Sequence, residues 1–217
     1  ERLDARSIER FLREARLAAA IHHANVVSAQ NVGRDAAGPY IVLDYVDGAS
    51  LEELLDRSAI KQRAFPVEVA LRIALDTLAG LEAVHQAKSA QGKPLHALHR
   101  DVSVQNILVG VDGVARLLDF GIARSELGGN TTDQHYLVGK LMYLPPEYLR
   151  RETLGPSADV YALGVTLWIL LTGVDPWVQE SEAQLLHQIL SKGVPPLSEQ
   201  IQVAPEVAAL VTRACAG

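Results

Sequence analysis

The chain has 217 residues and a formal net charge of −6, and 48% of its residues are hydrophobic. This composition is typical of a folded soluble protein, and the length suits one domain or a main domain with part of a second. The acidic balance argues against nucleic acid as a partner, because phosphate binding needs a basic surface. The single cysteine, Cys215, excludes an intrachain disulfide and is compatible with the reducing cytoplasm.

The sequence predicts neither a signal peptide nor a membrane span. Residues 1–16 are too charged to contain the apolar region of a signal peptide. The longest uncharged stretch considered, between Asp159 and Asp175, is shorter than the roughly 18–20 apolar residues that cross a bilayer. We therefore expect a buried helix there, in a cytoplasmic segment that could still belong to a longer, membrane-anchored protein.

The first part of the chain predicts one helix and one hairpin. Apolar side chains recur at helical spacing in residues 4–22, with Arg and Glu between them. Asn25–Val32 and Pro39–Val46 are short β-branched runs separated by a glycine-containing turn. One hairpin with one helix makes a poor sheet layer, so the sequence predicts that part of this layer is absent from the chain.

Helix signals dominate the rest of the chain. Ser50 and Glu53 occupy the two positions of a capping box, which predicts a short helix after residue 50. Pro66 begins a long helix that continues to Gln86. Further helices are expected at residues 157–172, 182–191 and 205–216.

Two segments in the middle of the chain break the helical pattern. Apolar runs at 107–109 and 115–118 flank Asp112-Gly113, which is a hairpin-turn signal. Residues 124–142 are polar and aperiodic and predict a mobile loop. The expected fold class is therefore α+β, with a small mixed start joined to a larger helical body.

Three segments carry residue types suited to phosphoryl transfer. They are His99–Asn106 (HRDVSVQN), Asp119–Gly121 (DFG) and Gly139–Glu147 (GKLMYLPPE). Phosphoryl transfer needs a carboxylate near the attacking hydroxyl and oxygen ligands for Mg²⁺ on the phosphates. Asp101 and Asn106, five residues apart on one loop, can face the same cleft, and Asp119 after the next strand can complete a metal site.

These segments resemble the catalytic loop, metal loop and activation-segment end of the eukaryotic-like (Hanks-type) bacterial serine/threonine protein kinases. The resemblance implies a protein-kinase-like fold, with residues 1–46 as a remnant of the N-lobe and hinge (helix C plus two strands). Residues 47–217 would form the mostly helical C-lobe. It also implies transfer of the γ-phosphate of ATP to Ser or Thr of protein substrates, with Asp101 as base and Mg²⁺ held by Asn106 and Asp119.

The same resemblance assigns the nucleotide contacts. Glu14 matches the helix residue that pairs with the ATP-positioning Lys. Leu43 matches the gatekeeper, and the backbones of Asp44 and Val46 would face the purine. Leu108 would pack under the base.

Structural and regulatory roles follow from the resemblance as well. His99 would pack against Phe120, Asp159 would brace the catalytic loop, and Glu147 would pair with Arg213. Arg100 would bind a phosphate on the activation segment, for which Thr131 and Thr132 are the favoured acceptors. An unmodified flexible loop remains the alternative to this phosphorylation.

Two positions depart from the family pattern together. The family usually has Lys two residues after the catalytic Asp, where this chain has Ser103, and Thr after the Gly of the third segment, where it has Lys140. We expect Lys140 to reach Asp101 and the transferred phosphate, with Ser103 hydrogen-bonding nearby, because the transition state needs a cation. The alternative is a decayed site with a solvated Lys140.

The Gly-rich loop and its following Lys are absent before Glu14, since all five lysines lie after the first helix. We therefore expect that both ends of a longer kinase domain are missing from the chain. A pseudokinase scaffold or nucleotide-binding regulatory module remains the alternative function, with a small-molecule phosphotransferase as a third.

Residues 1–217 alone are expected to transfer phosphate weakly or not at all, because nothing in them covers the phosphates or pairs with Glu14. A radiolabelled-ATP assay that compares this segment with the full-length protein measures the difference. Robust phosphorylation by the segment alone would contradict the expectation.

Overall fold

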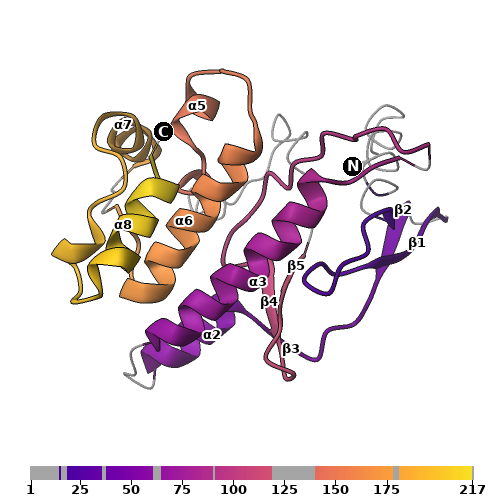
Figure 1. Ribbon diagram of the computed structural model, residues 1–217, viewed down its shortest axis with the longest axis horizontal. Coiled ribbons are helices and arrows are strands. Elements are labelled where there is room, and N and C mark those ends of the chain that lie inside the picture. The colour runs from indigo at the N-terminus through magenta and orange to yellow at the C-terminus, as the bar shows by residue number, and fades with distance from the viewer. Residues whose placement is uncertain are drawn as a thin grey trace.

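The computed structural model describes residues 15, 19–35, 38–60, 65–89, 91–118, 140–177 and 181–216. Most of the predicted first helix and almost all of the predicted loop at 124–142 lie outside these residues. The elements are arranged as one mainly helical body with a two-stranded hairpin beside it (Figure 1).

The predicted first hairpin is confirmed, with a later start. Strand β1 (Ala29–Arg34) pairs antiparallel with β2 (Pro39–Leu43), and the register shifts by a bulge near residue 30. The residues before β1 pair elsewhere: Val27 N–H donates to Leu117 O at 2.9 Å, and Leu117 N–H donates to Asn25 O at 2.9 Å. Residues 25–27 therefore join the first hairpin to the second sheet.

The second sheet has three antiparallel strands in the order β3–β4–β5. Strands β4 (Ile107–Gly110) and β5 (Ala115–Leu117) form the hairpin predicted around Asp112-Gly113. Strand β3 (Gly48–Ser50) was not predicted, because it has only three residues and is defined by its pairing with β4.

Local signals set the start of the first two described helices. Helix α2 (Leu51–Ile60) follows the predicted capping box, in which Glu53 N–H donates to Ser50 Oγ at 3.2 Å and Ser50 N–H donates to Glu53 Oε2 at 3.3 Å. Helix α3 (Val67–His85) begins directly after Pro66, as predicted.

Helix α6 (Pro156–Thr172) is the centre of the helical body. It is buried on nearly all sides, as its uncharged sequence predicts, and ends at Gly173, whose φ of 73° suits glycine. Figure 1 shows α6 between α3 and α8 (Pro205–Ala214), and it packs against both. The main hydrophobic core therefore lies around α6.

Shorter elements surround this core. Helix α7 (Glu182–Ser191) matches its predicted range, and a 3-10 turn (Leu197–Glu199) precedes α8. The four-residue helix α5 (Pro146–Leu149) was not predicted. None of the described helices is long and apolar enough to span a bilayer. A mainly helical α+β fold with few strands is thus confirmed.

A close contact on α3 generates a stability prediction. A Cβ on Gly80 would lie 2.6 Å from the backbone oxygen of Asn25, so G80A should force residues 25–27 away from α3. We expect urea denaturation to show a loss of about 1–3 kcal/mol in unfolding free energy, larger than the roughly 1 kcal/mol gain in helix propensity. In the control G155A the nearest atom is 3.9 Å away, and we expect a change below about 1 kcal/mol. Wild-type stability in G80A would refute the argument.

Candidate active site

One buried carboxylate holds the HRD segment in place. Asp159, on the first turn of α6, is 1% exposed. Its Oδ2 accepts a hydrogen bond from His99 N–H at 2.8 Å, and its Oδ1 accepts one from Arg100 N–H at 2.7 Å. His85 Nε2, at the end of α3, lies 2.7 Å from Oδ2. Three groups from two other segments thus converge on this one side chain.

These contacts outweigh the cost of burying the charge. Burial by itself would raise the pKa of Asp159, but the hydrogen bond with His85 and those from the two backbone N–H groups lower it below its ordinary value of 3.8. The ionised carboxylate is therefore the stable form at neutral pH.

The HRD segment also has an uncommon backbone at Arg100. Its φ of 64° lies in the left-handed region, which residues other than Gly rarely adopt. The hydrogen bond from Arg100 N–H to Asp159 compensates for this conformation, and the Arg100 side chain is exposed. The chain turns sharply here and delivers the next residue, Asp101, to the interior.

Asp101 is the centre of a polar cluster. It is 8% exposed, and its Oδ2 accepts hydrogen bonds from Asn106 Nδ2 at 2.8 Å and from Lys140 Nζ at 2.5 Å. Asn106 Nδ2 also donates to the Asp101 backbone oxygen at 2.8 Å. A carboxylate, an amide and an ammonium group thus meet at one point in the fold.

Asn106 is placed to offer an oxygen to a cation. Its Nδ2 donates to the backbone oxygen of Asp101 and to Asp101 Oδ2, so the amide oxygen Oδ1 is the atom left for a ligand. Its backbone oxygen accepts from Leu118 N–H at 2.8 Å, and Leu118 is the residue before Asp119 in the sequence. This donor chemistry fits Mg²⁺, which prefers oxygen ligands.

Ser103 does not share in this cluster. It is completely buried, and its hydroxyl has no hydrogen-bond partner within the described parts of the chain. Its backbone oxygen accepts from Asn106 N–H at 3.1 Å, so Ser103 helps to shape the loop. The predicted hydrogen bond of the Ser103 side chain is not seen among the described residues.

The segment between β2 and β3 holds the residues predicted to contact a purine. Leu43 ends β2 and is half-buried, and Asp44 N–H donates to Ser28 O at 2.9 Å. Val46 makes no backbone hydrogen bond to any described residue, so its N–H and carbonyl are available to a ligand. Leu108, in the middle of β4, is half-buried.

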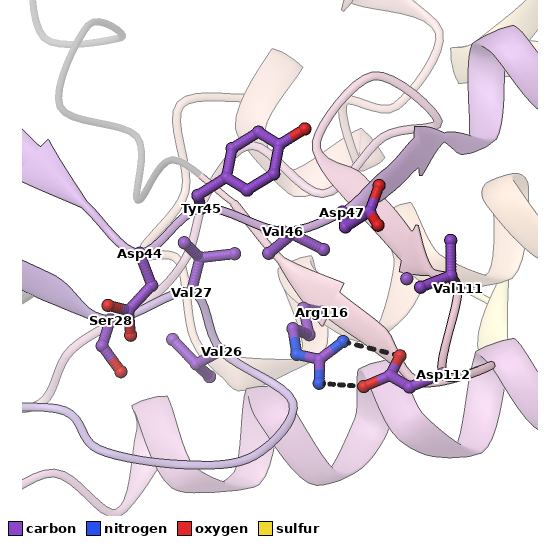
Figure 2. Close-up of a pocket in the computed structure, with 11 residues that line it drawn as sticks. Val26, Val27, Ser28, Asp44, Tyr45, Val46, Asp47, Val111, Asp112 and Arg116 are labelled. Atoms are coloured by element: carbon purple, nitrogen blue, oxygen red, sulfur yellow. Dashed lines mark hydrogen bonds and ion pairs between the residues drawn. The ribbon is translucent and has the colours of Figure 1, made fainter.

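A pocket of about 370 Å³ borders this segment, lined by residues 26–28, 44–47, 110–112 and Arg116. Figure 2 shows the ion pair between Arg116 and Asp112 on its β4–β5 side, where Nη2 and Oδ2 are 2.6 Å apart. The hydrogen bond from Arg116 lowers the pKa of Asp112 to about 2. Leu43 and Leu108 do not line this pocket, so it is separate from those two predicted contacts.

Comparison with known protein families shows which family the chain belongs to. The model of the protein kinase domain matches residues 1–215. The chain belongs to the protein kinase domain family. The resemblance of its three segments to the eukaryotic-like kinases is thereby confirmed.

Curated relatives are similar over nearly the whole chain. The chain is 34% identical to tyrosine-protein kinase MasK of Myxococcus xanthus. The matched region covers 96% of this chain and 32% of MasK. It is 33% identical to serine/threonine-protein kinase PknL of Mycobacterium tuberculosis over 93% of its length, or 48% of PknL. For PknB of Mycolicibacterium smegmatis the identity is 34%, over 95% of this chain and 32% of PknB. The chain thus spans a third to a half of these relatives.

Several assigned kinase residues lie outside the described parts of the chain, and their roles remain predictions. They are Glu14, Asp119, Phe120, Thr131 and Thr132.

His99, by contrast, is described and fully buried. Its Nδ1 accepts a hydrogen bond from the backbone N–H of Asp101 at 3.3 Å.

The expected pair between Glu147 and Arg213 is not seen. Glu147 lies on α5, and no ion pair joins it to Arg213, although both residues are described. Arg213 instead lines a groove of about 240 Å³ between α3, α6 and α8, together with Leu78 and Leu163.

The structure adds two kinase-domain residues that the sequence did not single out. His85, the last residue of α3, hydrogen-bonds Asp159. Asp76 is 6% exposed on α3, where its Oδ2 accepts from Ala115 N–H at 3.1 Å and its Oδ1 lies 3.1 Å from Arg72 Nη2. A carboxylate among the apolar positions of a helix was the available signal for Asp76.

Replacing Asp159 tests the support of the HRD segment. D159N loses the charge-assisted bonds from His99 and Arg100, and we expect a loss of about 1–3 kcal/mol in unfolding free energy at pH 7. Because the native pKa is lowered, the advantage of wild type over D159N is full above the ordinary pKa of 3.8 and shrinks as the pH falls below it.

Urea denaturation at several pH values measures this difference. D56N, at an exposed position on α2, is the matched control and should remain close to wild type at every pH. A wild-type advantage over D159N that grows on acidification would rule out the stabilising role of the ionised carboxylate.

Proposed function

We propose that this kinase domain transfers the γ-phosphoryl group of ATP to Ser and Thr hydroxyls of proteins, with Asp101 as the catalytic base. The observation that carries the proposal is the Asp101 carboxylate, fixed by Asn106 at 2.8 Å on the HRD loop. A carboxylate held in this way can accept the proton of an acceptor hydroxyl.

The reaction balances with the groups present. The acceptor hydroxyl gives its proton to Asp101, and its oxygen forms a bond to the γ-phosphorus. The bond between the γ-phosphorus and the β–γ bridging oxygen breaks, and ADP leaves. Asp101 orients the nucleophile, while Asn106 keeps the carboxylate facing it.

Asn106 Oδ1 and the carboxylate of Asp119 are the proposed magnesium ligands. The engaged Nδ2 of Asn106 supports this assignment, as does the bond from Leu118 N–H to Asn106 O next to Asp119 in the sequence. When bound, Mg²⁺ would neutralise charge on the β- and γ-phosphate oxygens.

The nucleotide is proposed to lie against the segment between β2 and β3. The backbone of Val46 has no hydrogen-bond partner in the described residues and can bind the purine edge, together with the Asp44 carbonyl. The half-buried side chains of Leu43 and Leu108 would cover the base. Glu14 would pair with the Lys that positions the phosphates.

Serine and threonine are the proposed acceptors. PknL and PknB are named serine/threonine kinases and MasK a tyrosine kinase, so relatives of similar identity differ in the acceptor residue that their names state. Residues 103–105 do not resemble the tyrosine-kinase pattern in this loop, which favours Ser and Thr.

Removal of the proposed base tests the function. D101N in the full-length protein should lower kcat by about 10²–10⁴, because general base catalysis contributes that much. The assay follows radiolabelled phosphate from ATP onto a peptide library that contains Ser, Thr and Tyr, followed by phosphoamino-acid analysis. D56N, the same substitution at an exposed residue of α2, should retain wild-type turnover.

Three results would contradict the proposal. They are wild-type turnover in D101N, label mainly on tyrosine, and ATP binding by the wild type without any transfer. The last result would favour the scaffold function.

A further inference from the structure

The cation that faces Asp101 comes from a different segment than the family pattern implies. The family pattern implies a Lys two residues after the base, but here that position is the completely buried Ser103. A serine is neutral and short, and its hydroxyl has no partner among the described residues. The HRD loop therefore provides no cation at this position.

Lys140 brings a positive charge to the same place. Its Nζ lies 2.5 Å from Asp101 Oδ2, and the two side chains are only 15% and 10% exposed. The same carboxylate oxygen accepts from Asn106 Nδ2 at 2.8 Å. An ammonium group this close to the base also lies next to the site where the base meets the acceptor hydroxyl.

The three residues Met142, Tyr143 and Leu144, shortly after Lys140, are buried. Met142, Tyr143 and Leu144 are 5%, 3% and 5% exposed, and the first two belong to the main core together with Val102 of the HRD loop. Leu144 N–H donates to Leu141 O at 3.0 Å, which closes a turn after Lys140. A shared core thus fixes the lysine and the base relative to each other.

We propose that Lys140 positions Asp101 and stabilises the charge that develops on the transferring phosphoryl group, so that the activation segment, not the catalytic loop, supplies this cation. The inference rests on the proposed function and adds that phosphoryl transfer depends on Lys140. Asp101 and Asn106 belong to one loop, whereas Lys140 comes from a segment 39 residues away from Asp101.

The proposed role predicts a specific kinetic signature. Lys140 contacts the base and not the segment near Val46, so its loss should affect the chemical step and leave nucleotide binding unchanged. In full-length K140M we expect kcat to fall by about 10²–10³, the usual loss when one preorganised charge-stabilising group is removed. The KM for ATP and the dissociation constant for ATP·Mg²⁺ should change by less than about threefold.

Two further variants separate this role from simple structural support. K140R keeps a cation and should retain more turnover than K140M. The double variant S103K/K140T moves the cation to the HRD loop. Its kcat should be at least about tenfold higher than that of the single variant K140T. K192M is the matched control, since Lys192 is exposed at the end of α7 and should keep wild-type turnover.

The outcomes distinguish this inference from the function beneath it. Wild-type turnover in K140M, while D101N is inactive, overturns the role of Lys140 alone. Equal losses of turnover in K140R and K140M, together with weaker ATP·Mg²⁺ binding, also overturn it, because they indicate a structural role. Absence of phosphoryl transfer in the wild-type protein overturns both proposals. If S103K/K140T does not fold, as shown by its thermal unfolding, the comparison of K140R with K140M decides.

Discussion

The Asp159 carboxylate is the constraint on which the site depends. It is buried in the first turn of α6, and it accepts hydrogen bonds from the backbone of His99 and Arg100 while contacting His85. Without these bonds, a left-handed Arg100 next to buried polar groups would be costly. The most buried of the described helices thereby fixes the backbone that leads into Asp101. Core packing around α6 and the geometry of the proposed base are parts of one arrangement.

The cluster around Asp101 extends this arrangement to the activation segment. Asn106 binds Asp101 from within the same loop, and Lys140 binds it from a segment whose following residues are buried in the core. A base held by two donors keeps a single orientation, which is what positioning catalysis requires. Because the two donors come from different segments, the orientation of Asp101 depends on the positions of both segments.

Local chemistry made much of the fold predictable. The capping box of Ser50 and Glu53, Pro66 before α3 and the uncharged run in α6 act over a few residues, and each gave the correct element. Strand β3 and helix α5 escaped prediction, since three or four residues carry no periodicity and tertiary pairing defines them. His85 and Asp76 escaped because each of these polar side chains bonds to a partner far along the chain.

By itself, the sequence determined the family, the order of the longer elements and the residue types at the site. HRD, the Asn five residues later and DFG identify phosphotransfer chemistry, since that reaction needs those groups at that spacing. The sequence also predicted that Lys140 reaches Asp101, across 39 residues. Only the tertiary structure decided the other pairings of charged groups: His85 reaches Asp159 across 74 residues, whereas Arg213 lines a groove between α3, α6 and α8 and makes no ion pair with Glu147, although both residues are described. Such pairings depend on how helices pack around a common core, and no local propensity encodes that packing.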